Sequence, residues 1–225
     1  MKIIYKFMFV AISMLAFINN MYAIENNSNT QNEPLVEESV VYQKFVEDIL
    51  AEIYQVLPNS KSNKEIYSYF DKLTQEKFNI NYIALWSLGA YGKNISAETK
   101  DRYLKIATRY MVISYGNVFT KYYETYSYRI TKTEKIEENQ YAVKFYIEPK
   151  NNSKIQDNAI LAEWKIEKDD TGKMYVADII VNGISLVNAQ RFEFERSLKN
   201  NNGSVDAFSN ALEIEVKKSE DRLGI

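Results

Sequence analysis

A change of hydrophobic period after Tyr123 constrains the fold of this chain more than any other feature of its sequence. Before this residue, apolar side chains recur at intervals of three and four, which is the period of amphipathic helices. After it, apolar and polar residues alternate, which is the period of half-buried strands. Helical patterns return near the end of the chain. The sequence therefore predicts an α+β fold in which helices pack on an antiparallel sheet.

Two amphipathic helices are predicted at the start of the folded part. The folded part begins near Leu35, and the first helix is indicated by apolar residues that repeat over 42–57; it stops at Pro58, whose ring disfavours continuation of a helix. The second covers about 63–77 and begins with a capping box, in which the Ser62 hydroxyl and the Glu65 carboxylate satisfy backbone donors. The apolar stripes of both helices are expected to pack in the core.

Two further helices are predicted before the strands. Residues 78–91 are apolar on nearly every side, which indicates a short, buried or half-buried helix that ends at Gly89 or Gly92. Ser96 then caps a long helix whose apolar arc is wider than packing on one neighbour requires. Either this helix lies between the sheet and the other helices, which we favour, or part of its arc lines a cavity.

About four antiparallel strands are predicted next. The first two alternate over 126–131 and 141–148, and the third, over 160–166, places its apolar side chains on one face. Residues 169–172 form a hairpin turn, and their two acids are better explained by turn preference than by acid/base chemistry. The fourth strand covers 174–181 and is apolar on both faces except for its one acid.

The chain is expected to leave the sheet at a corner formed by Asn182-Gly183, because glycine adopts positive φ without penalty. Beyond the corner, a helix is predicted over 186–198 and a short helix over 205–212. Residues 213–225 are read as a charged tail. No repeat or internal linker appears, so one domain is predicted.

The first 34 residues are expected to precede the folded domain. Residues 1–23 carry Lys2 and Lys6 near their start and an apolar run over 7–18, and Ala23 stands at a cleavage position. This pattern indicates an export signal peptide. The apolar run is shorter than a bilayer span, although a retained anchor is the alternative. Residues 24–34 are polar and rich in Asn, which suits a flexible leader.

Composition excludes several classes of function. The chain of 225 residues has no His and no Cys, which removes imidazole bases, thiolates, disulfides and the usual zinc sites. No metal site is predicted. A formal net charge of −2 gives no electrostatic case for binding nucleic acid. The 18 Tyr and 11 Phe suit a core with wet edges or a large apolar cavity.

One stretch is more specific than these patterns. Residues 178–194 read Asp-Ile-Ile-Val-Asn-Gly-Ile-Ser-Leu-Val-Asn-Ala-Gln-Arg-Phe-Glu-Phe, and a Leu-Gly pair follows the apolar helix upstream. Together with the order of elements between them, these features resemble the MlaC, or toluene-tolerance auxiliary, family. The signature positions are Leu88, Gly89, Asp178, Gly183, Ser185, Arg191 and Phe194. The chain departs from the family pattern at Met174, Ala177 and Asn182, where the family usually has Trp, an aromatic residue and Glu.

The resemblance covers residues 35–212 and implies a phospholipid-binding domain that is not an enzyme. It implies a monomeric carrier in the periplasm of a Gram-negative bacterium, part of the Mla lipid-asymmetry transport system. Its cargo would be a glycerophospholipid, held in an apolar pocket enclosed by helices and a curved sheet, with no other cofactor. Its implied partners are an outer-membrane Mla lipoprotein–porin complex and an inner-membrane Mla ABC transporter.

Large apolar side chains on the helices and the sheet are the candidates for lining such a pocket. They are Trp86, Tyr110, Met111, Tyr115, Phe119, Phe145, Ile147 and Trp164. Each is equally well explained as part of a solid core. Arg191 also has two readings: its guanidinium binds a lipid phosphate, or it pairs with Asp178 or backbone carbonyls to fix the corner, which is the reading we favour.

Two other classes of protein stay open at this point. One is an α+β lyase or isomerase that uses Asp178 and a tyrosine. Such an enzyme needs a perturbed acid beside a polar cavity, whereas the sequence supplies one acid in an apolar strand and no His partner. The other is an exported interaction protein with a solid core.

Overall fold

The computed structural model describes residues 33–150 and 159–225. The predicted signal peptide and nearly all of the predicted leader lie outside these residues. The elements run in the order α2 (Glu33–Asn59), α3 (Asn63–Lys77), α4 (Ile80–Ser87), the 3₁₀-helix η1 (Gly89–Gly92), α5 (Ala97–Tyr122), β1 (Tyr126–Glu137), β2 (Gln140–Pro149), β3 (Ile160–Lys168), β4 (Met174–Val181), β5 (Ile184–Ser185), α6 (Leu186–Asn200) and α7 (Val205–Leu223).

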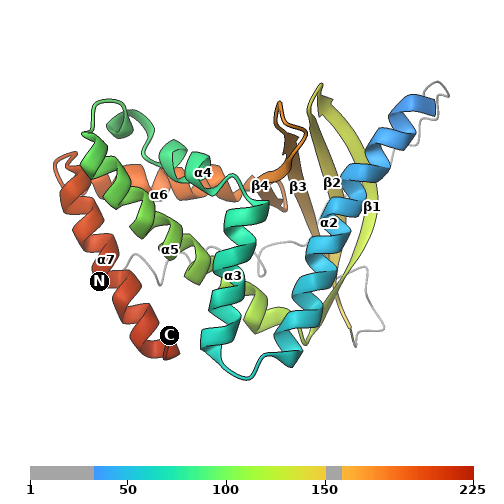
Figure 1. The fold of residues 1–225 in the computed structure, drawn as a ribbon, viewed down its shortest axis with the longest axis horizontal. Helices are drawn as coiled ribbons and strands as arrows, with labels where there is room; N and C mark the ends of the chain where they lie inside the picture. The colour runs from blue at the N-terminus through green and yellow to red at the C-terminus, as the bar shows by residue number, and fades with distance from the viewer. Residues whose placement is uncertain (1–32, 151–158) are drawn as a thin grey trace.

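The strands form one antiparallel sheet in the order β1-β2-β3-β4-β5, and the helices lie around it in two groups (Figure 1). Helix α2 runs along β1 and β2, while α4, α5, α6 and α7 lie together at the opposite end of the molecule, with α3 between the two groups (Figure 1). The α+β class and the packing of helices on an antiparallel sheet are thus confirmed.

The sheet has five strands rather than about four, and the extra strand arises at the predicted corner. Asn182 and Gly183 both have positive φ, +49° and +80°. This is the geometry of a two-residue hairpin loop, for which Asn-Gly is a preferred sequence. The chain therefore folds back before it leaves the sheet, and Ile184 pairs with Val181 across the turn.

The helix starts follow the capping residues seen in the sequence. The Ser62 hydroxyl accepts from the backbone N–H of Glu65 at 3.3 Å, and the Glu65 carboxylate accepts from that of Lys61 at 2.8 Å. In a standard capping box the acid accepts from the N–H of the capping residue, here Ser62, whereas Glu65 accepts from that of the preceding residue, Lys61. Helix α2 continues one residue beyond Pro58.

The end of the chain is helical where a charged tail is expected. Helix α7 runs to Leu223, and its second half buries Val216 against the rest of the protein. Its charged residues occupy the outer positions of an amphipathic helix, so a local excess of charge did not indicate an end of structure. The predicted short helix over 205–212 is the first part of this longer one.

The core lies between the sheet and the helices. On the sheet, the side chains that face the helices are almost fully buried at Val143, Trp164, Ile166 and Val176. Trp164 contacts both Phe145 and Phe78 edge to face, with ring centroids 5.9 and 6.1 Å apart. These aromatic contacts join the sheet to the segment between α3 and α4.

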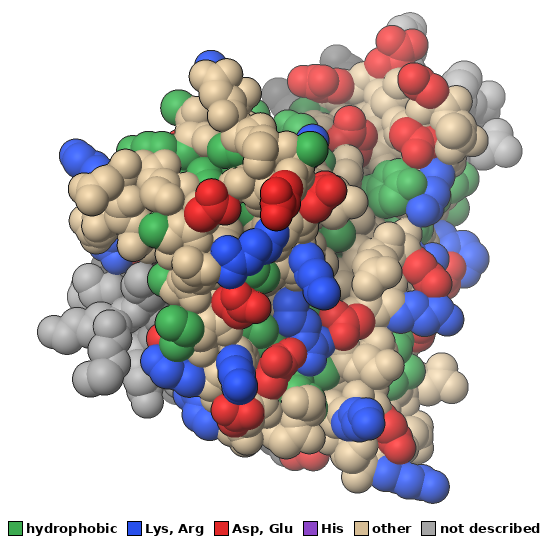
Figure 2. Space-filling model, turned by 60° about the vertical axis from the view of Figure 1, so that its left-hand side comes forward, with side chains coloured by type: hydrophobic (Ala, Val, Ile, Leu, Met, Phe, Trp, Pro, Cys, Tyr) green, Lys and Arg blue, Asp and Glu red, His purple; other side chains and the backbone are tan. Residues whose placement is uncertain are grey.

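The surface is mixed in charge. On the face shown in Figure 2, acidic and basic side chains lie side by side over the helices, without a large area of either sign. Within residues 33–150 and 159–225, no helix combines the length and the hydropathy that crossing a membrane requires.

Candidate functional site

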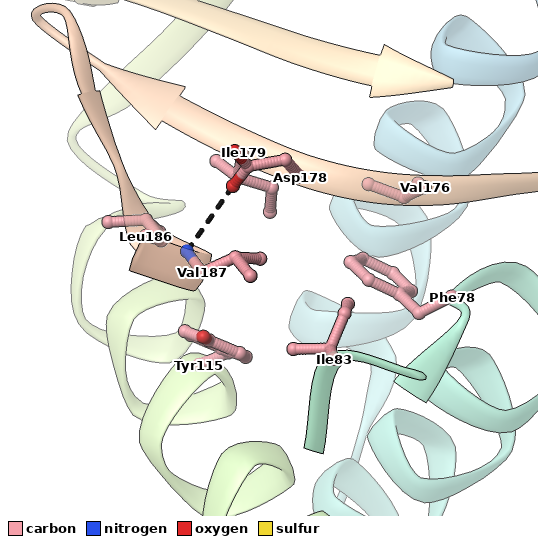
Figure 3. A pocket seen from close by; sticks show the side chains of 8 residues that line it. All are labelled: Phe78, Ile83, Tyr115, Val176, Asp178, Ile179, Leu186 and Val187. Carbon is pink, nitrogen blue, oxygen red and sulfur yellow. Dashed lines mark hydrogen bonds between the residues drawn. The ribbon is translucent and has the colours of Figure 1, made fainter. Parts of the chain in front are cut away.

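A small cavity lies at the seam where strand β4 meets helices α4, α5 and α6 (Figure 3). One acid is present among its lining residues, and the others are apolar or aromatic. We define the seam by these lining residues, which are Phe78, Ile83, Tyr115, Val176, Asp178, Ile179, Leu186 and Val187. Sites for apolar ligands have linings of this composition, although they enclose about 300–1,000 Å³.

A bulge in β4 brings its side chains to the seam. The register of β3 against β4 shifts between Lys165 and Ile166, which leaves Ala177 as the extra residue. As a result, Val176 pairs with Ile166 and Ile179 pairs with Trp164, so both of these β4 side chains lie on the helix-facing side of the sheet.

Asp178 links the sheet to the first turn of α6. Its Oδ1 accepts a hydrogen bond from the backbone N–H of Val187 at 3.3 Å (Figure 3), and Ser185 Oγ accepts from that of Asn188 at 3.0 Å. A carboxylate at a helix N-terminus satisfies an otherwise unbonded donor and interacts favourably with the helix dipole. Asp178 thus acts as a cap supplied by the neighbouring strand.

Arg191 does not pair with Asp178, which corrects the expectation from the sequence. Its Nε donates to Glu195 Oε1 at 2.9 Å, because residues four apart on α6 lie on the same side of the helix. Its guanidinium carbon lies 4.8 Å from the centre of the Trp86 ring, a cation–π contact. Arg191 therefore joins α6 to α4.

The two parts of the sequence signature meet at this contact. Gly89 follows α4 with φ +55°, and a Cβ built on it would lie 1.7 Å from Glu195 Oε1. The left-handed backbone favours glycine there, and a larger residue would also displace the Glu195 carboxylate. Leu88, the preceding residue, is fully buried. Sequence spacing alone does not reveal that Leu88-Gly89 and Arg191 belong to one contact.

The cavity is narrow. Its volume is about 10 Å³, close to the minimum space that holds one water molecule. Tyr115 is its second polar side chain, and burial raises the pKa of the Tyr115 hydroxyl, with smaller contributions from Tyr110 and the charge of Asp178. A ligand with an acyl chain therefore requires this cavity to widen.

The structure distributes the predicted lining residues over four environments. Tyr115 lines the cavity, and Tyr110, Met111, Phe145 and Trp164 lie in the solid core around it. Phe119 and Ile147 are half-buried. Trp86 is 41% exposed and lies on the outer side of α4. The sequence did not single out the other apolar residues of the seam, because apolar residues on β4 and α6 look like ordinary core positions.

A second hollow is larger and polar. It is an open groove of about 780 Å³ between α3, α4, α5 and α7. Arg109 crosses it, with NH1 on Asp71 Oδ2 and Nε on Glu220 Oε1, both at 2.6 Å. Burial raises the pKa of Asp71, while Arg109 opposes that shift. The groove is thus lined by paired charges. No cluster of potential metal ligands occurs in the described residues.

Comparison with known proteins supports a specific family. The family model described as MlaC protein matches residues 43–213. A search of curated proteins gives no match. Among solved structures, a phospholipid-binding protein from Ralstonia solanacearum in complex with a phospholipid matches with a TM-score of 0.63 and 13% identity, over 80% of this chain and 97% of that one. At this identity, the likeness establishes a common fold.

The fold and the seam define a class of protein: an α+β domain with a narrow apolar cavity between its sheet and its helices. The family match covers most of the described domain, from α2 into α7. The chain belongs to the MlaC family.

Proposed function

We propose that this protein is a phospholipid carrier that holds the acyl chains of its cargo at the seam. The observation that carries the proposal is the apolar cavity between β4 and helices α4, α5 and α6 in a chain of the MlaC family. The Ralstonia protein, which has the same fold, is described as phospholipid-binding and was solved with a phospholipid.

The energetics of lipid transfer support this proposal. Moving a CH₂ group from water to an apolar site gains about 0.8 kcal/mol, so a chain of about 16 carbons gains about 12 kcal/mol. This gain would act against the cost of separating the apolar seam. Because the lining is apolar, the acyl chains would replace protein contacts of the same kind, and the headgroup would stay near solvent.

The same geometry favours binding over catalysis. Asp178 is the single acid of the seam, and it is already engaged as the cap of α6. A lyase or isomerase needs an acid or base that is free to reach its substrate. We therefore propose a protein that is not an enzyme and whose only small-molecule partner is its lipid.

The cellular role is proposed from family membership. Residues 1–23 would act as a signal peptide that exports the chain to the periplasm of a Gram-negative bacterium. The mature domain would carry phospholipid between an outer-membrane Mla lipoprotein–porin complex and an inner-membrane Mla ABC transporter. In this way it would maintain the lipid asymmetry of the outer membrane.

The direct test is to purify the mature chain from a Gram-negative periplasm, extract it with organic solvent and identify bound lipid by mass spectrometry. The expected result is phospholipid in stoichiometric amount. A lipid-free protein from this source would contradict the carrier and favour an interaction protein with a solid core.

A pair of variants locates the bound lipid. Ile179→Asn places a polar amide in the seam and is expected to lower the co-purified lipid several-fold, because a buried amide without partners is unfavourable beside an acyl chain. Ile136→Asn is the matched control, since Ile136 is 42% exposed on β1. Equal lipid content in the two variants would place the lipid elsewhere.

A variant at Arg191 distinguishes a structural role of this signature residue from binding of the lipid phosphate. Its contacts with Glu195 and Trp86 predict that Arg191→Ala mainly lowers thermal stability. Loss of bound lipid with unchanged stability would instead assign the guanidinium to the lipid phosphate.

A further inference from the structure

The outer face of α4 presents two large aromatic side chains that the described part of the chain leaves uncovered. Tyr82 is 51% exposed and Trp86 is 41% exposed. They lie one helical turn apart, with stacked rings whose centroids are 6.1 Å apart. Large aromatic side chains at this level of exposure on a surface helix indicate a contact surface rather than core packing.

This face has no charge of its own, although cations border it. Residues 78–92 contain no charged side chain, and Lys77 and Lys93 stand directly before and after them. Lys93 is exposed. The guanidinium of Arg191 lies against the Trp86 ring from the neighbouring helix α6. The result is an aromatic surface without charge of its own. The Arg191 beside it is paired with Glu195, and the Lys77 ammonium lies over the Phe45 ring of α2.

The aromatic face adjoins the seam. Helix α4 has only eight residues, and its inner side carries Ile83, which lines the cavity. An α-helix with its side chains is about 10 Å across. The outer aromatic side chains are therefore one helix width from the place where the acyl chains would be held.

We propose that the outer face of α4 contacts the headgroup layer of a lipid bilayer when phospholipid enters or leaves the seam. This inference rests on the proposed carrier function and adds a partner to it. Tyr and Trp have an apolar body and a polar edge, so they concentrate at the level of membrane headgroups. The exposed Lys93, which follows this segment, and the Arg191 guanidinium against Trp86 are cations that a lipid phosphate can approach.

The contact would let the cargo pass between bilayer and seam without crossing bulk water. A lipid that leaves beside α4 meets Tyr82 and Trp86 first, while its headgroup can pair with the cations at the border. The formal net charge of −2 supplies no overall attraction to an anionic bilayer, so the contact would rest on the aromatic side chains and would be brief.

The two tryptophans provide a direct measurement. Trp86 is exposed, whereas Trp164 is 2% exposed and lies in the core. The probe is a vesicle of equal parts phosphatidylethanolamine and phosphatidylglycerol that carries brominated acyl chains, which quench tryptophan at the membrane surface. We expect the full mature protein to lose part of its fluorescence as soon as it meets these vesicles. The Trp86→Phe variant should lose none at once and dim only slowly, as brominated lipid exchanges into the seam beside Trp164. Unquenched Trp86 would overturn the proposal.

A double variant gives an independent readout. Tyr82→Ala/Trp86→Ala is expected to weaken vesicle binding, measured by sedimentation, about tenfold, because two interfacial anchors are removed. The control is Val41→Ala/Ile214→Ala, which removes exposed apolar side chains of α2 and α7. The control should bind like the wild type. Melting temperatures verify that both variants are folded, and equal binding of the two variants would overturn the proposal.

The lipid content of each sample separates this inference from the proposed function. Quenching of Trp86 by vesicles without any co-purified lipid would support the membrane contact and contradict the carrier. Co-purified lipid without quenching would support the carrier and contradict the contact. If the double variant fails only on vesicles that contain a membrane protein complex, the face binds a protein, and the bilayer contact is overturned.

Discussion

The packing of helices α3, α5, α6 and α7 on one another, which we call the helix-rich end, differs from the seam in how it is held together (Figure 1). Among α3, α5 and α7, Arg109 bonds to both Asp71 and Glu220 at 2.6 Å. Across the seam, Asp178 accepts from the Val187 N–H at 3.3 Å, and the remaining lining is apolar. Short charge-assisted bonds fix a geometry, whereas apolar contacts can be exchanged for those of a ligand. We infer that opening is confined to the seam.

The largest effect is expected in the aromatic core of the helix-rich end. Phe194 is 2% exposed and contacts Phe208 and Tyr110, with ring centroids 4.9 and 5.8 Å apart. Phe194→Ala should lower the free energy of unfolding by about 3–5 kcal/mol, because it leaves a cavity among these rings. The measurement is urea denaturation.

Phe192 provides the matched control on the same helix. It is 65% exposed, so Phe192→Ala should change the free energy of unfolding by no more than about 0.5 kcal/mol. A small effect of Phe194→Ala would mean that the helix-rich end is as adaptable as the seam, and the contrast between the two regions would be lost.

The junction of α4 and α6 should show an intermediate effect. Gly89→Ala is expected to cost about 2 kcal/mol, because it strains a positive φ and displaces Glu195. Gly172→Ala, at φ +83° with no atom within 4 Å of its Cβ, should cost only the backbone strain, about 1 kcal/mol. Urea denaturation tests both. In a Glu195→Ala background the difference between the two should shrink, and an unchanged difference would contradict the steric explanation.

Substitutions in the seam should change the rate of phospholipid exchange more than the free energy of unfolding. Asp178→Ala removes one cap of α6 and is expected to cost about 1 kcal/mol. Ser185→Ala removes the other cap, at Asn188, and should cost a similar amount. Only Asp178 lines the cavity, so exchange of fluorescent phospholipid should accelerate in Asp178→Ala alone. If both variants exchange phospholipid at the same rate, Asp178 does not control the opening of the seam.

Ionisation of the buried tyrosines has no effect at neutral pH and lowers stability only under alkaline conditions. Burial raises the pKa of Tyr110 to about 12, whereas a tyrosine of the unfolded chain ionises near about 10. The raised pKa contributes stability that is complete below about pH 10 and is lost as the pH rises towards about 12. Burial raises the pKa of Tyr115 at the seam as well. Denaturant midpoints should therefore be constant up to about pH 10 and fall above it; a constant midpoint at higher pH would contradict the burial of these hydroxyls.

Local patterns in the sequence predicted most of the helices and strands. Ser62 and Ser96 cap α3 and α5, and alternation over 126–131 and 141–148 matches the first half of β1 and most of β2. These signals depend on neighbours within a few residues, and such neighbours interact in the same way in any fold. The charge of residues 213–223 misled, because an amphipathic helix and a solvated tail look alike until a packing partner is known.

The seam was less predictable, because its members come from β4, α4, α5 and α6. Asp178 stood out as a lone acid in an apolar strand, but its partner was expected to be Arg191 rather than a backbone N–H. Trp86 was chosen for its size, although the outer side of α4 exposes it. Residue type indicates that a side chain can line a cavity, while its direction depends on how the helix is rotated in the fold.

By itself, the sequence determined the order of helices and strands, the Asn182-Gly183 turn and the family signature, since each of these is written in residues close together along the chain. The tertiary structure decided which residues meet: Asp178 with the start of α6, Gly89 with Glu195, and the apolar side chains of β4 with three helices. These contacts join positions far apart in sequence, and their geometry depends on packing of the whole domain.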